Sequence, residues 1–206
     1  AGKSTLIKVI GGAHLPDEGT IEIEGRSNPI VTPQDSLKAG IGIIYQEFNL
    51  GPGLTARENI FLGQEPSRLS FIPRSEEKEK TLNLFERIGV EIDPGKLCSQ
   101  LSVAEQQVVE IAKALSQNAR IIVMDEPTAA LTPREVEGLL RVVRELRSQG
   151  IGIIYISHRL DEIEAIADRV TILRDGAHVA TREKSDLNRE QMIALMVGRS
   201  LEKEFP

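Results

Sequence analysis

The chain has 206 residues, which at roughly 150 residues per domain predicts one large domain or one domain with a subdomain. Hydrophobic residues make up 40% of the chain and charged residues 27%, which is ordinary globular usage and excludes disordered and low-complexity classes. The net charge of -6 has the wrong sign for a protein that simply coats nucleic acid or anionic lipid.

The sequence contains one cysteine, Cys98, so it predicts no intramolecular disulfide and no zinc or redox motif. The longest apolar runs, such as residues 151–156, are far shorter than the ~20 residues that a membrane-spanning helix needs. No Met stands at position 1 and no signal-peptide pattern is visible. We therefore expect a fragment that is cut at its start and does not cross a membrane.

Strand patterns occur at both ends and in the middle of the chain. Residues 19–25 alternate apolar and polar side chains between glycines, which predicts a half-buried strand at an antiparallel edge. Three continuous β-branched runs, 41–45, 121–124 and 151–156, are typical of parallel strands covered on both faces. A helical pattern over 133–149 separates the last two runs, so the sequence predicts a βαβ unit there.

The last part of the chain predicts a hairpin and a helix. Residues 170–173 and 178–181 flank an Asp175-Gly176 turn, which favours an antiparallel hairpin, and residues 189–197 have the pattern of a closing helix. Upstream, residues 66–117 carry almost no strand signals. Helical spacing over 76–88 and 103–115 predicts that this stretch is a helical insertion.

The first residues resemble the second half of a P-loop, whose full pattern is G-x-x-x-x-G-K-[ST] at the start of a helix. The resemblance implies that Gly2 lets backbone N–H groups approach a phosphate, that Lys3 supplies positive charge and that the Ser4 hydroxyl ligates Mg²⁺. Thr5, the next residue, is expected to bind the nucleotide as well. The alternative is that Ser4 and Thr5 merely begin an amphipathic helix.

The apolar run at 121–124 ends in two adjacent carboxylates, Asp125 and Glu126, and resembles a Walker B motif. Open α/β sheets bind their ligands at such strand ends. Asp125 then holds Mg²⁺, directly or through water, and Glu126 polarises the attacking water as general base. The alternative is a solvated acidic turn after a strand.

Leu101 and Ser102 open the helix at 103–115, with Ser102 as N-cap and Glu105 at the capping-box position. The segment also resembles the signature motif of ATP-binding cassette (ABC) proteins, whose usual core is Leu-Ser-Gly-Gly-Gln. Val103 and Ala104 stand in place of the two glycines, and Glu105 in place of the glutamine. A signature motif serves the nucleotide on the opposing cassette, and we expect that site to be the weaker one only if the loss of glycine prevents close backbone approach.

Other ABC motifs follow in order. Residues 45–47 resemble the Q-loop, in which Gln46 contacts Mg²⁺ and water, and residues 156–159 resemble the switch loop, in which His158 places a neutral imidazole against the γ-phosphate. His14 and His178 are expected on the surface. In the D-loop position Thr132 replaces the usual aspartate, although it still starts a capping box.

Three stretches, 101–115, 127–132 and 196–199, resemble one branch of the ABC family, the ATP-binding components of bacterial monosaccharide importers of the ribose, galactose and xylose type. In that branch one polypeptide carries two fused cassettes, and the resemblance is to the first. It implies a P-loop NTPase α/β fold with a parallel sheet, antiparallel edge strands and a helical subdomain. We expect a single nucleotide-binding domain over 1–206, with its core at 1–65 and 118–206 and the subdomain at 66–117.

The resemblance also implies the site and the partners. ATP and Mg²⁺ are expected between two cassettes, bound by Gly2, Lys3, Ser4, Thr5, Gln46, Asp125, Glu126 and His158 of one and by the signature residues Ser102 and Ala104 of the other. Permease subunits and, indirectly, a periplasmic or extracellular sugar-binding protein complete the importer at the cytoplasmic face of the bacterial membrane, and no nucleic acid is expected. The alternatives are a soluble ABC ATPase of DNA repair or translation and a regulatory module that does not hydrolyse ATP.

Overall fold

A three-stranded parallel sheet lies at the centre of the computed structural model, which describes residues 2–27, 29–64 and 74–198. The strand order is β3-β4-β5, with Ile121 paired to both Ile41 and Gly152. The predicted parallel pairing is confirmed. The strands are β3 (Ile41–Ile44), β4 (Ile121–Asp125) and β5 (Gly152–Ile156).

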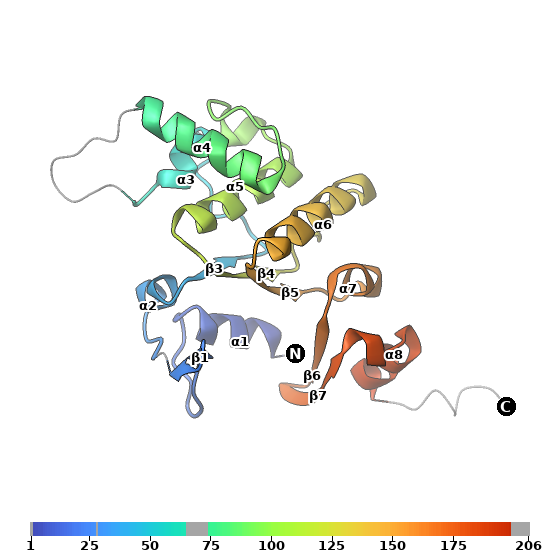
Figure 1. Cartoon of the computed structure of the whole chain (residues 1–206). Helices are drawn as coiled ribbons and strands as arrows, with labels where there is room; N and C mark the ends of the chain where they lie inside the picture. Colours follow the sequence, from blue (N-terminus) through green and yellow to red (C-terminus); the bar gives the residue numbers. More distant parts are fainter. Residues whose placement is uncertain (1, 28, 65–73, 199–206) are drawn as a thin grey trace.

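Helices cover both faces of this sheet (Figure 1). Because successive strand residues point to opposite faces, Ile122 and Met124 join the larger apolar cluster, while Val123 packs in the smaller one with Ile7. β5 is an edge strand of this sheet, and its Ile154 is 41% exposed, so the prediction of full coverage was wrong for β5. The covering helices are α1 (Lys3–Ile10), α5 (Val103–Ser116) and α6 (Pro133–Ser148).

Side-chain caps fix where α5 and α6 begin. The Glu105 N–H donates to the Ser102 hydroxyl at 3.2 Å, and the Ser102 N–H donates to the Glu105 carboxylate at 2.7 Å. Thr132 and Glu135 form the same reciprocal pair at α6. Both predicted capping boxes are confirmed, and each satisfies backbone donors that would otherwise lack partners.

Two hairpins flank the sheet. Asp175 and Gly176 both have positive φ, as a type I′ hairpin turn requires. They join β6 (Arg169–Arg174) to β7 (Ala177–Glu183). The first hairpin pairs β1 (Glu22–Ile23) with β2 (Arg26–Ser27), so the strand predicted over 19–25 is antiparallel but shorter than expected. A 3-10 turn (Lys184–Asp186) precedes α8 (Arg189–Val197), the predicted closing helix.

Helices predominate in the described part of the predicted insertion, residues 74–117. It contains α4 (Arg74–Ile88), a 3-10 turn (Cys98–Gln100) and α5, and Phe85 and Ile111 share one buried cluster with Met124 of the sheet. Its residues 66–73, like residues 1 and 199–206 of the expected domain, lie outside the described residues. The division into core and subdomain stays a prediction.

Three short helices were not predicted: α2 (Pro33–Lys38), α3 (Ala56–Phe61) and α7 (Leu160–Ile166). Each has six or seven residues, about two turns, which is too short for helical periodicity to stand out in a sequence. Among the described residues, no helix has the length and apolarity to cross a membrane.

Candidate active site

The carboxyl ends of β3, β4 and β5 meet at one edge of the sheet because the strands are parallel. Gln46 follows β3 by two residues, Asp125 ends β4, Glu126 comes next, and His158 follows β5 by two residues. The Glu126 N–H donates to the carbonyl oxygen of Ile156 at 2.9 Å, which holds the ends of β4 and β5 together. The fold therefore places the predicted strand-end residues on one edge.

The Glu126 carboxylate faces the His158 imidazole. Glu126 Oε1 lies 3.3 Å from His158 Nδ1, and the two side chains are 28% and 64% exposed, respectively. Glu126 also has a φ of 47°, a left-handed conformation that costs a non-glycine residue about 1–3 kcal/mol. Such strain tends to occur at functional sites. A partly shielded carboxylate therefore lies beside an accessible imidazole.

The N-terminus of α1 lies next to the carboxylate at the end of β4. Burial raises the pKa of the Asp125 carboxyl above its usual value, the Glu126 charge raises it further, and the Lys3 ammonium lowers it. Gly2 has a φ of 95°, and a Cβ there would lie 2.8 Å from the Gly176 Cα, so residue 2 must be glycine. The site thus combines two carboxylates with one cation.

We expect Asp125→Asn to stabilise the nucleotide-free protein at pH 7. Because the folded-state pKa of Asp125 is raised, its favourable contribution is present below the unfolded-state pKa and is lost as the pH rises through the folded-state pKa. At pH 7 the ionised carboxylate therefore opposes folding. Thermal melts should show a gain of a few degrees for Asp125→Asn over wild type, shrinking toward pH 4, whereas the exposed control Asp17→Asn changes little. A lower melting temperature at pH 7 would contradict this electrostatic picture.

Ser4 and Thr5, in the first turn of α1, and Gln46, after β3, are exposed to solvent. A hydrogen bond links the loop that carries Gln46 to α5, because the Asn49 N–H donates to the buried Glu110 carboxylate at 2.7 Å. Burial raises the pKa of Glu110. The structure therefore joins the Gln46 loop to the helix that begins at Ser102.

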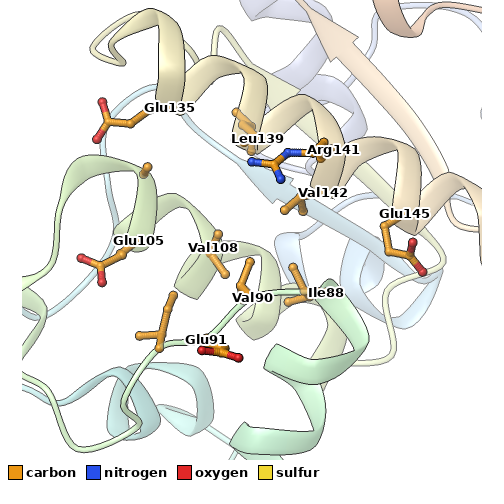
Figure 2. Close-up of a pocket in the computed structure, with 14 residues that line it drawn as sticks. Ile88, Val90, Glu91, Glu105, Val108, Glu135, Leu139, Arg141, Val142 and Glu145 are labelled. Atoms are coloured by element: carbon orange, nitrogen blue, oxygen red, sulfur yellow. The ribbon is translucent and has the colours of Figure 1, made fainter.

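Ser102 and Ala104 lie apart from this group. Both stand at the start of α5, and Ala104 lines a cavity of about 430 Å³ between the end of α4, the first turns of α5, and α6. Figure 2 shows this cavity, with Glu105 and Val108 on one side and Leu139 and Arg141 on another. None of the strand-end residues lines it. The structure thus does not bring the signature residues to the strand-end residues within this chain. Their role on an opposing cassette stays a prediction.

Two buried polar residues with a structural link to the site were missed. Glu162 of α7 accepts hydrogen bonds from Thr128, which follows Glu126, and from Ser157, which precedes His158. Asn59 of α3 accepts a hydrogen bond from the loop after Gln46. Glu162 stands among Asp161 and Glu164, and an acidic first turn is normally a solvent-exposed complement to the helix dipole. The signal available was the four-residue spacing to the buried Ile166, which puts Glu162 on the inner face.

The chain is similar in sequence to known ABC proteins over its whole length. The family model for the ABC transporter matches residues 1–129. The chain is 50% identical over its whole length to "Ribose import ATP-binding protein RbsA 2" of Burkholderia ambifaria, covering 41% of that protein, and 46% identical to "Putative ribose/galactose/methyl galactoside import ATP-binding protein 2" of Agrobacterium fabrum, covering 40%. It therefore spans about two fifths of the length of these relatives.

Solved structures show the same fold. MJ1267, an ATP-binding cassette of an ABC transporter, superposes with a TM-score of 0.81 at 27% identity, over 95% of this chain and 82% of that one. The ATP-binding cassette MJ0796, in a dimeric post-hydrolysis state bound to ADP and Pi, gives a TM-score of 0.72 at 27% identity, over 88% and 80% of the two chains.

The parallel sheet with carboxylates at its edge and a Gly-Lys-Ser helix start defines a P-loop NTPase α/β fold, which the fold neighbours confirm. The chain belongs to the ABC transporter family.

Proposed function

We propose that this chain is the ATP-hydrolysing cassette of a bacterial monosaccharide importer. The observation that carries the proposal is the Glu126–His158 pair, 3.3 Å apart at the sheet edge where Lys3 acts on Asp125. Relatives at 46–50% identity bear names of ribose or galactose import ATP-binding proteins, which supports the substrate class.

The start of α1 fits the phosphates of ATP. In the described structure no side chain caps this N-terminus, and its first turn has no acidic residue, so its N–H groups and helix dipole favour an anion. Gly2 allows the backbone to approach, Lys3 supplies positive charge, and Ser4 and Thr5 follow in the first turn.

Mg²⁺ fits the donor set of Ser4, Gln46 and Asp125. Magnesium sites in nucleotide hydrolases use few protein oxygen ligands and complete their coordination with water and phosphate. When bound, the ion neutralises charge on the phosphates. Burial and the Glu126 charge raise the pKa of Asp125, and a bound cation would oppose both effects because it stabilises the ionised carboxylate.

Glu126 acts as general base, because its carboxylate is held at the sheet edge and within reach of solvent. His158 contacts the γ-phosphate and the Glu126 carboxylate, so it orients the base and the phosphate toward each other. Lys3 and the α1 amides stabilise charge on the transferred group, and preorganised electrostatics of this kind are usually the largest contribution to rate.

A second cassette completes the site. We propose that Ser102 and Ala104 contact the nucleotide held by the opposing cassette, fused in the same polypeptide. A cassette of similar fold, MJ0796, is described as dimeric and bound to ADP and Pi, which supports this arrangement. Val103 and Ala104 occupy the first turn of α5, where the usual motif has glycines, so backbone approach there is more restricted than usual.

Closure of the two cassettes on ATP drives the permease subunits, with a periplasmic or extracellular sugar-binding protein delivering the substrate. The protein then works as a peripheral component at the cytoplasmic face of the cell membrane, without nucleic acid.

The test is ATPase activity of the intact protein, with and without its permease in liposomes. We expect permease to stimulate turnover and Glu126→Gln to lose the stimulated activity. Glu137→Gln, at an exposed residue of α6, should keep the stimulated activity. Turnover that ignores permease and responds to DNA or ribosomes would instead place the protein among soluble ABC ATPases.

A further inference from the structure

Glu162 of α7 is a fully enclosed carboxylate, with 2% of its surface exposed. One oxygen, Oε1, accepts a hydrogen bond from the Thr128 hydroxyl at 2.7 Å and lies 3.2 Å from Arg159 Nε. The other, Oε2, accepts from the Tyr155 and Ser157 hydroxyls, each at 2.9 Å. Both oxygens are therefore fully engaged.

The partners of Glu162 come from the two segments that carry the catalytic pair. Thr128 lies two residues after Glu126, on the chain leaving β4. Ser157 lies directly before His158, and its hydroxyl also accepts from the Arg159 N–H at 3.0 Å. A single side chain thus connects the segment after Glu126 to the loop of His158.

Stability alone does not account for this arrangement. Burying a carboxylate has a large desolvation penalty, and well-packed apolar side chains often give equal or greater stability than a buried ion pair. What an apolar cluster does not provide is direction, because hydrogen bonds to two fixed oxygens constrain where each partner lies. The Glu162 contacts constrain the chain on both sides of the 3.3 Å Glu126–His158 contact.

We propose that Glu162 is a positioning residue that sets the distance between the Glu126 carboxylate and the His158 imidazole by linking Thr128 to Ser157. The proposal rests on the hydrolytic function proposed above. It predicts that loss of the link slows the chemical step and leaves ATP binding intact, because the residues at the start of α1 are not part of it.

The experiment compares Thr128→Val, which keeps the shape but removes the hydroxyl, with Thr128→Ser, which keeps the hydroxyl. Glu162→Gln alters the link at its centre, and Glu164→Gln on the same helix is the matched control. In the intact protein, kcat and KM for ATP are measured together with the imidazole NMR signal of His158, assigned by its loss in His158→Asn.

We expect Thr128→Val and Glu162→Gln to lower kcat about 10-fold, since small misplacements of catalytic groups are costly, with KM within about twofold and a shifted His158 signal. Thr128→Ser and Glu164→Gln should match wild type. An unshifted His158 signal and unchanged kcat in Thr128→Val would overturn the proposal, while Glu126-dependent turnover in wild type would leave the proposed function standing. An inactive wild type would overturn the proposed hydrolytic function. The His158 signal would still show whether Glu162 positions the imidazole.

Discussion

Glu126→Gln should abolish hydrolysis at this site and leave ATP bound. Glutamine has the size of glutamate but does not accept a proton from water, and a positioned general base contributes typically ~10²–10⁴-fold to rate. The backbone of residue 126 is held by its hydrogen bond to Ile156, so the substitution need not move the strand ends. We expect kcat at this site to fall at least about 100-fold, with affinity for ATP retained.

The measurement counts the nucleotide that stays bound. After incubation with Mg-ATP, rapid gel filtration and acid quench, the variant should carry one ATP per polypeptide at this site, where wild type carries ADP. Glu137→Gln, which removes an exposed carboxylate of α6, should behave as wild type. Recovery of ADP alone from Glu126→Gln would show that another group acts as base.

Asn59→Ala should have the largest effect on stability. The Asn59 side chain is fully buried; its Oδ1 accepts from the Gly51 N–H at 2.7 Å, and its Nδ2 lies within hydrogen-bond distance of the Gly51 and Thr55 carbonyls and of Cys98 Sγ. Each buried polar group left without a partner costs about 1–3 kcal/mol. Loss of this amide should therefore destabilise the segment by at least about 2 kcal/mol.

Hydrogen exchange of the intact protein measures the local stability of the segment around Asn59. The Cys98 N–H donates to the Leu54 carbonyl and the Ala56 N–H to the Lys96 carbonyl, so peptides over 51–56 and 96–99 report on the junction. A loss of about 2 kcal/mol accelerates exchange about 30-fold. Asn49→Ala, at an exposed asparagine, is the control. Equal exchange in both variants would mean that Asn59 does not hold the junction.

Long, strongly patterned elements were predictable. The apolar run ending at Asp125 and the amphipathic pattern from Pro133 define β4 and α6 almost to the residue, because burial on one or both faces leaves a regular spacing. The Asp175-Gly176 turn was equally clear, since few other residue pairs adopt positive φ twice in succession.

The features that the sequence did not predict depend on contacts between segments that are distant along the chain. The Thr-x-x-Glu signature of the capping box at Thr55 is present in the sequence. Helix α3 itself has only six residues, and its packing against α5 joins segments that are distant in sequence. Glu162 and Asn59 are polar residues whose burial depends on partners distant in sequence, such as Thr128 and Cys98. A pattern of residue types carries no information about such pairings.

The strand-end residues of the site were predicted from motif order, and the structure places them on one edge. The roles of these residues remain predictions. The signature residues Ser102 and Ala104 are a different case from the strand-end residues. Their predicted ligand is the nucleotide held by another cassette, and no contact within one chain tests that prediction.

The most direct measurement is a structure of the intact Glu126→Gln protein with Mg-ATP. We expect phosphates on the backbone at the start of α1 and on the Lys3 ammonium, Mg²⁺ among Ser4, Gln46 and Asp125, His158 at the γ-phosphate, and Ser102 facing a nucleotide on the opposing cassette. Nucleotide bound away from the strand ends, for example in the cavity between α4, α5 and α6, would contradict the proposed function.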